Sequence, residues 1–192
     1  MRTALFALAL AASPALLAQE VNGGLHTGLS LPIGDLTDRT NAGTNQVLGI
    51  HIGGHLDFNI TPHHQVRAQL TYHSFPGSRW NSGWKNDYRD LQVGAEWVYN
   101  FDTPSRGWYV LAGAHLNSFK VEAENDLFPY PTYTATQSGR LGIRGGGGYT
   151  FNKNFSLEGH LNQVSVDKYG SDGFGFDTAT WVQCSAVFRF GR

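Results

Sequence analysis

His73 and Ser74 stand side by side, and a histidine and a serine are the base and the nucleophile that a hydrolase needs. A nucleophilic serine also requires that its base be within hydrogen-bond reach and be oriented by a third group. This pair falls in a segment that alternates apolar and polar residues, and adjacent side chains on a strand point to opposite faces. The spacing is wrong for one site, so we expect no catalytic residues and no enzymatic activity.

The remaining histidines and the cysteine raise the question of a metal centre. His51 and His55 are four positions apart, which is about 13 Å along a strand and too far to share a metal ion. His63 and His64 fall in a short polar connection, where we expect them to be solvated. The single cysteine, Cys184, can form no internal disulfide and has no cluster of partner ligands. We expect neither a metal nor a cofactor.

The elements that carry these residues alternate with period two. Between Val47 and Ile60, leucine, isoleucine and phenylalanine dominate every second position, and His51, His55 and Asp57 lie between them. This alternation gives a strand one apolar and one polar face. Comparable segments span residues 21–31, 47–60, 65–75, 88–101, 107–121, 138–151, 154–166 and 178–190. The pattern slips near Gln163, where we expect a β-bulge.

The connections between the segments fall into two alternating classes. The short polar ones are 61–64, 102–106 and 152–153, and the long ones are 32–46, 76–87, 122–137 and 169–177. Each segment has about the 9 to 11 residues, or slightly more, that a tilted strand needs to cross a bilayer. We therefore predict an all-β fold, an eight-stranded antiparallel up-and-down transmembrane β-barrel. A soluble β-sandwich is the alternative, but it gives no reason for two classes of connection.

The composition agrees with a barrel that is apolar outside and polar inside. The chain has 24 glycines, 13% aromatic and 15% charged residues, and its net charge of −1 gives no indication of a nucleic-acid partner. Eight strands enclose a space only wide enough for side chains. We expect it to hold a polar network of Asp57, Arg67, Glu96, His115, Arg140, Arg144, Glu158, His160 and Arg189. A narrow water-filled passage is the alternative, because the inward glycines Gly142, Gly146 and Gly148 leave room.

The beginning of the chain has the pattern of a secretory signal. Arg2 precedes an unbroken apolar run from Ala4 to Ala12, and the run is too short for a membrane-spanning helix. We expect cleavage after Ala18, within a few residues. The domains are then a signal peptide, 1–18, and a β-barrel domain, 19–192.

The pattern from Gly23 to Phe190 resembles the small outer-membrane β-barrel family that includes the OmpA transmembrane domain and OmpX. The resemblance is carried by GLSLP at 28–32, VGAEWVYNF at 93–101, GGGGYTFNKNFSLEG at 145–159 and the aromatic ending VFRF at 187–190. In that family an aromatic C-terminal strand is the signal for the barrel-assembly machinery. The resemblance therefore implies this machinery as a partner and Phe188 and Phe190 as the signal. Gly191 and Arg192 depart from the pattern because they follow the last Phe.

The same resemblance implies a multi-pass protein of the bacterial outer membrane with both termini in the periplasm and no peptidoglycan-binding domain. Its partners would be outer-membrane lipids and lipopolysaccharide, and we expect a monomer. Aromatic residues of the long outer segments are candidate binding anchors, namely Trp80, Trp84, Phe128, Tyr130, Tyr133 and Tyr169. We expect a non-enzymatic, structural or surface-interaction role for these outer loops. A narrow, porin-like pore for small solutes or ions is the first alternative, and a lipid A-modifying enzyme that uses Ser74, as in lipid A deacylases, is the lower one.

Overall fold

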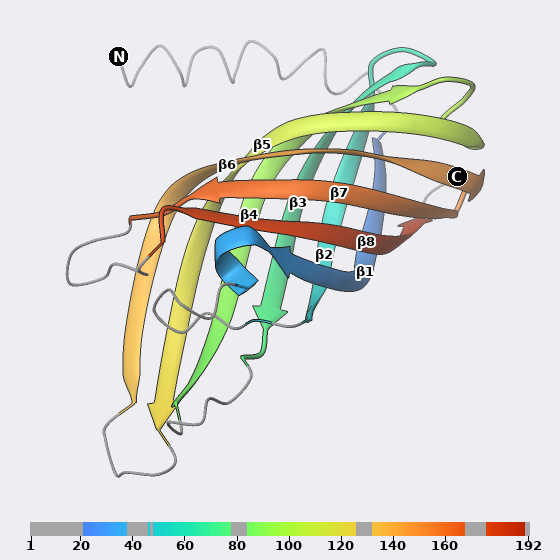
Figure 1. The fold of residues 1–192 in the computed structure, drawn as a ribbon. Coiled ribbons are helices and arrows are strands. Elements are labelled where there is room, and N and C mark those ends of the chain that lie inside the picture. Colours follow the sequence, from blue (N-terminus) through green and yellow to red (C-terminus); the bar gives the residue numbers. More distant parts are fainter. Residues whose placement is uncertain are drawn as a thin grey trace, which may run out of the picture.

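The structure is a closed antiparallel barrel in which strands β1 to β8 follow one another in chain order (Figure 1). This computed structural model describes residues 21–37, 46, 48–77, 84–125, 132–167 and 176–190. The strands are β1 (Val21–Ile33), β2 (Gly49–Asn59), β3 (His64–Phe75), β4 (Trp84–Asn100), β5 (Gly107–Asn125), β6 (Tyr133–Asn152), β7 (Phe155–Ser165) and β8 (Thr178–Phe190). The predicted fold class is confirmed. The predicted signal peptide and most residues of the predicted long connections lie outside the described part.

Strands β1 and β8 close the barrel by pairing from Gly23↔Phe190 to Ile33↔Thr180. The short connections β2–β3, β4–β5 and β6–β7 lie at one end, together with the start of β1 and the end of β8. We call this the turn end, and the opposite end the loop end. At the loop end a short 3-10 helix, η1 (Gly34–Thr37), follows β1 and lies close to β8.

The outer face of the wall is apolar because the alternating residues of every strand point away from the lumen. Ile50 and Ile52 on β2 are 62% and 61% exposed, whereas His51 between them is 2% exposed. Outward aromatic residues gather at the turn end, where Tyr99 packs against Phe101 and Phe155 packs against Phe188. Among the described residues, no helix is long and apolar enough to cross a bilayer.

Strands β4, β5 and β6 continue past the rest of the barrel at the loop end. The pairing of β3 with β4 stops at Phe75↔Tyr88, but β4 and β5 remain paired as far as Trp84↔Asn125. Residues 122–125 and 133–137 are therefore strand, although the sequence predicted a long connection from 122 to 137. The prediction was wrong because these segments lack the apolar face that marked the other strands. In Figure 1 this extension reaches the bottom of the view.

The predicted bulge near Gln163 is also wrong. Strand β7 pairs with β8 in unbroken register through Gln163↔Thr180 and Val164↔Ala179. Val164 and Val166 broke the expected alternation because they point inward into an apolar region of the lumen. The register shifts lie instead at Asn117/Ser118 and at Thr150/Asn152. Gly139, with φ of 72°, stands opposite the first of them and adopts a backbone conformation that disfavours other residues.

Candidate functional site

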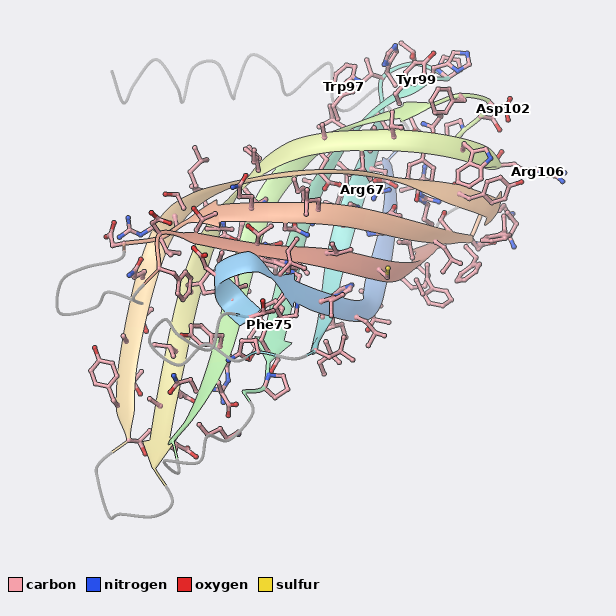
Figure 2. The ribbon with its side chains drawn as sticks, in the orientation of Figure 1. Arg67, Phe75, Trp97, Tyr99, Asp102 and Arg106 are labelled. Atoms are coloured by element: carbon pink, nitrogen blue, oxygen red, sulfur yellow. The ribbon has the colours of Figure 1, made fainter. Side chains whose placement is uncertain are left out.

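The lumen of the barrel holds three layers of side chains, and its chemistry changes from one end to the other. Nearest the turn end lies the ion network, defined as Asp57, Arg67, Glu96, Arg144, Glu158 and Arg189. The histidine layer follows in the middle. An apolar cluster, the loop-end seal, closes the other end. Figure 2 shows Arg67 inside the barrel and Phe75 near the loop end, beside η1.

Strand register builds the ion network. Asp57 on β2 pairs with Arg67 on β3, and Arg67 pairs with Glu96 on β4, so opposite charges stand in one row. Glu96 then pairs with Gly113, and Gly113 pairs with Arg144. A Cβ atom on Gly113 would lie 2.8 Å from the Cγ atom of Glu96. Gly113 is therefore required for the Glu96 side chain to pass it and reach Arg144.

Arg67 is the centre of the network and is 2% exposed. Its Nε donates to Asp57 Oδ1 at 2.7 Å, and its Nη1 donates to Glu158 Oε1 at 2.6 Å from across the lumen. Its Nη1 also lies 3.9 Å from Glu96 Oε2. Because three carboxylates surround one guanidinium, the network is neutral only with two further cations.

Arg144 and Arg189 are these two cations. Arg144 forms an ion pair with Glu96 and donates through Nη2 to Gln69 Oε1 at 2.7 Å. Arg189 donates through Nε to Asp57 Oδ2 at 3.2 Å. The three arginines thus match the three carboxylates in charge. A buried charge is stable only when it is paired and hydrogen-bonded in this way.

The histidine layer contains His26, His51, His55 and His73, with ring centroids of neighbouring members 5.4 to 6.1 Å apart. Ser30 Oγ lies 3.1 Å from Nδ1 of both His51 and His73. Nε2 of His73 lies 3.2 Å from the side-chain oxygen Oε1 of Gln92, and Nε2 of His51 lies 2.9 Å from Ser185 Oγ. Ser30 thus joins two histidines in a chain of polar contacts that runs from Gln92 to Ser185.

The geometry of the layer does not fit a metal centre. Within the described ranges, no three His, Cys, Asp or Glu side chains are arranged to hold a metal ion. Nor does it fit the hydrolase hypothesis, because His73 points inward and is fully buried while Ser74 lies on the opposite face. Described side chains of the lumen such as Arg67, Gln69 and Arg144 bond to neighbouring side chains, and Asp57 and Arg189 also line a small cavity toward the turn end.

The loop-end seal is a cluster of buried apolar side chains from η1, six strands and the segments next to them. Its members are Leu36, Phe75, Tyr88, Phe119, Val121, Ala135, Val164, Val166, Phe176, Ala179 and Trp181. Trp181 is fully buried, with its ring centroid 5.7 Å from Phe75 and 6.1 Å from Phe119. These edge-to-face aromatic contacts fill the lumen on the loop-end side of the histidine layer.

The space that the inward glycines leave is occupied. A Cβ atom on Gly142 would lie 2.3 Å from His115 Cε1, and one on Gly148 would lie 2.5 Å from the Tyr109 hydroxyl. One on Gly146 would lie 2.1 Å from the backbone oxygen of Gly159. The glycines therefore make room for packed neighbours.

The remaining residues of the expected polar network lie in different places. His115 and His160 are buried in the lumen, where His115 Nδ1 lies 3.1 Å from Asn117 Oδ1 and His160 Nε2 lies 3.4 Å from Glu158 Oε2. Arg140 is outside the network because it lies four residues along β6 from Arg144, about 13 Å nearer the loop end, where it forms an ion pair with Asp167.

Several lumen residues were missed by sequence reasoning. Tyr109 donates its hydroxyl to Glu158 Oε1 at 2.6 Å, and Gln69 donates to Glu96 Oε1 at 3.0 Å. Asp90 is fully buried beside the seal, on the face shared with Gln92. His26 lies on the glycine-rich first strand, for which no face was predicted. Tyr109 and Asp90 are in phase with inward neighbours, so a stricter count of alternate positions would have found them.

Comparison with known proteins finds one matching family model and several solved structures with a similar barrel. The family model for the outer membrane protein beta-barrel domain matches residues 3–190. The N-terminal barrel of Pseudomonas aeruginosa OprF is similar, with a TM-score of 0.53 and 16% identity over 90% of this chain and 99% of that chain. Neisserial surface protein A has a TM-score of 0.54 and 15% identity over 88% of this chain and 97% of that chain. Ail, the attachment invasion locus protein of Yersinia pestis, has a TM-score of 0.54 and 16% identity over 89% of this chain and 99% of that chain. No curated protein sequence matches.

Proposed function

The chain belongs to the outer membrane protein β-barrel family, and we propose that it is a non-enzymatic, surface-interaction barrel that acts through its loop end. In this orientation the turn end and both termini face the periplasm, as short turns do in outer-membrane barrels. The observation that carries the proposal is the β4–β6 extension. It continues beyond the seal, where the other strands have ended, and it presents charged side chains.

The outward face of this extension supports contact with lipopolysaccharide. Arg89 and Lys120 are cross-strand partners two residues beyond the apolar Leu91, and both bind Glu122 at 2.8 Å and 2.5 Å. The hydrogen bond from Lys120, with Arg89 nearby, lowers the pKa of the Glu122 carboxyl below its ordinary value of 4.5. Further out, the same face carries Lys85, Asp87 and Glu124, so its three cations and three carboxylates balance. Arg89 and Lys120 are its cations nearest the apolar wall, at the level where phosphates of the outer leaflet lie.

The names of structural relatives agree with a surface role. Ail is an attachment invasion locus protein, and one structure of it contains the heparin analogue sucrose octasulfate. The seal also favours a surface role over solute passage, because any solute would have to cross a packed apolar cluster.

Adhesion of proteoliposomes to beads coated with lipopolysaccharide or heparin tests the proposal. We expect one of the two kinds of bead to retain the proteoliposomes. Proteoliposomes that carry the Arg89→Gln/Lys120→Gln variant should be retained less. The matched control is Arg106→Gln/Lys153→Gln, which removes two cations from the turn end. Equal retention of protein-free and protein-containing liposomes on both beads would remove the support for a surface role.

Conductance in planar bilayers separates this proposal from the pore alternative. We expect folded wild-type protein to show no discrete current steps. Replacement of Phe75, Phe119 and Trp181 by alanine removes three of the five aromatic side chains of the seal. This variant provides the comparison, after circular dichroism has verified its β structure. Reproducible steps from the wild type would favour the pore.

Processing and assembly complete the proposal. Residues 1–18 act as a cleaved signal peptide, and the outward Phe188 and Phe190 are the signal for the barrel-assembly machinery. Both rings are exposed on the last strand, at 45% and 57%. Because the barrel has no open strand edge, it is expected to be a monomer.

A further inference from the structure

A groove of about 710 Å³ runs along the outer wall of the barrel across β6, β7, β8 and β1. Its floor is formed where Gly147 pairs with Gly159 and Gly159 pairs with Cys184. These two glycines have no side chains, so the wall is thin here while the surrounding outward residues are large. Leu29, next to Cys184 on β1, borders the floor and is 51% exposed.

A wall of aromatic rings bounds the groove on the turn side. Trp108 and Tyr149 are cross-strand partners with ring centroids 5.0 Å apart, and Tyr149 lies 5.0 Å from Phe151. The edge-to-face contacts hold the three rings in fixed positions. Trp108 is 64% exposed, so it stands out from the barrel beside the groove.

Two cations lie just beyond this aromatic wall. Arg106 precedes Trp108 by two residues and Lys153 follows Phe151 by two, and both lie outside the strands, in the short connections of the turn end. Both side chains are exposed. The two turns are neighbours, because Ser105 and Lys153 line the same small cavity. Figure 2 shows Arg106 at the tip of the turn end.

These cations differ from every other described arginine and lysine. Arg67, Lys85, Arg89, Lys120, Arg140, Arg144 and Arg189 all form ion pairs with carboxylates. Within the part of the chain that the structure describes, Arg106 and Lys153 are the two basic residues that form none. An apolar groove that ends near two cations that form no ion pair is complementary to an acyl chain attached to an anion.

We propose that this groove binds one anionic glycerophospholipid of the periplasmic leaflet. One acyl chain lies on the glycine floor against the aromatic wall, and the phosphate headgroup lies between Arg106 and Lys153. This site rests on the proposed orientation of the barrel, in which the turn end faces the periplasm. It lies at the opposite end from the surface that is proposed to act outside the cell.

Native mass spectrometry of the folded protein in micelles tests the site, with equal amounts of dimyristoyl phosphatidylglycerol and dimyristoyl phosphatidylcholine as probes. We expect one phosphatidylglycerol to stay bound under activation that removes phosphatidylcholine. Two cations near a lipid headgroup give a preference of about tenfold or more. Arg106→Gln/Lys153→Gln should abolish this preference.

A pair of glycine variants tests the groove itself. Gly159→Leu fills it, and a Cβ atom there meets nothing within 4 Å, so the barrel accepts the side chain. Gly54→Leu is the matched control because Gly54 also faces outward, on β2, and its nearest neighbour to a Cβ atom is 3.6 Å away. We expect lipid retention to be lost in Gly159→Leu and kept in Gly54→Leu.

Cys184 provides a second measurement that needs no change in the groove. It is the single cysteine of the chain, it is exposed, and it lines the groove. Phosphatidylglycerol should slow its alkylation by N-ethylmaleimide more than phosphatidylcholine does, and Arg106→Gln/Lys153→Gln should remove the difference.

Equal retention of the two lipids by the wild type would overturn the proposal, as would equal retention by the two glycine variants. A dimer that Gly159→Leu abolishes would assign the groove to a second copy of the chain and also overturn it. The bead assay tests the loop end and does not measure binding of either phospholipid. A failure of the surface role can therefore be distinguished from a failure of this lipid site.

Discussion

The two ends of the lumen are filled by opposite kinds of chemistry. Toward the turn end, Arg67 is held by Asp57 and Glu158 in a network whose charges cancel. At the loop end, Phe75 and Trp181 belong to an apolar cluster. Both ends are packed with side chains, but the ion network depends on the pairing of opposite charges and the seal depends on shape. The lumen therefore acts as a fixed support for the outer wall and the β4–β6 extension.

The largest expected effect is the loss of Arg67. Arg67→Ala leaves three buried carboxylates without their central cation, and such a break costs roughly 3–5 kcal/mol of the free energy of unfolding. Urea unfolding of the protein in liposomes measures it. Arg140→Ala is the control, because Arg140 is partly exposed and pairs with Asp167 at the rim. Its loss should cost about 1 kcal/mol or less. Equal losses would mean that the network is not the stabilising element.

Removal of the Trp181 side chain tests how much the packing of the seal contributes to stability. Trp181→Ala leaves a cavity against Phe75 and Phe119, and we expect a loss of about 3 kcal/mol. Val98 belongs to a smaller buried cluster with Tyr109 and Leu111, and Val98→Ala should cost about 1 kcal/mol. Unfolding followed by circular dichroism compares the two variants. A larger loss for Val98→Ala would contradict the expectation that the seal contributes more stability than this smaller cluster.

A smaller effect should follow when one hydroxyl is removed from the ion network. Tyr109→Phe deletes the donor to Glu158 Oε1 but keeps the ring, and a hydrogen bond to a charged group contributes about 1.5 kcal/mol. Tyr149→Phe is the control because Tyr149 lies on the outer face. If both variants lose the same stability in urea, the Tyr109 hydroxyl has no specific role inside the barrel.

The smallest effect concerns pH at the loop end. The pKa of Glu122 is lowered from 4.5, chiefly by the hydrogen bond from Lys120. A lowered pKa means that the interaction is fully present above pH 4.5 and is lost as the pH falls through the folded-state value. Carbon NMR of the carboxyl group should give a midpoint below 4.5, and Lys120→Met should raise it. An unchanged midpoint in Lys120→Met would contradict the assigned cause.

Some of these features were readable from the sequence, and others were not. The faces of Asp57, Arg67, Glu96 and Glu158 follow from alternate positions, and the structure places all four in the lumen. Arg140 has the same alternation, but it lies two inward positions nearer the loop end than Arg144 and pairs with Asp167 instead. Alternation predicts a side of the wall. It does not predict register, and register decides which charges meet.

The sequence by itself determined that strands alternate apolar and polar faces, because side chains on a strand have period two. It also determined the two classes of connection and the aromatic ending of the last strand. Only the tertiary structure decided which end of the lumen is charged and which is sealed. The inward Val164 broke the alternation near Gln163, and Trp181 was a single large apolar residue on an otherwise mostly polar face. They become a core only when closure of the barrel brings β3, β5, β7 and β8 around the same space, since contacts between distant strands leave no local pattern.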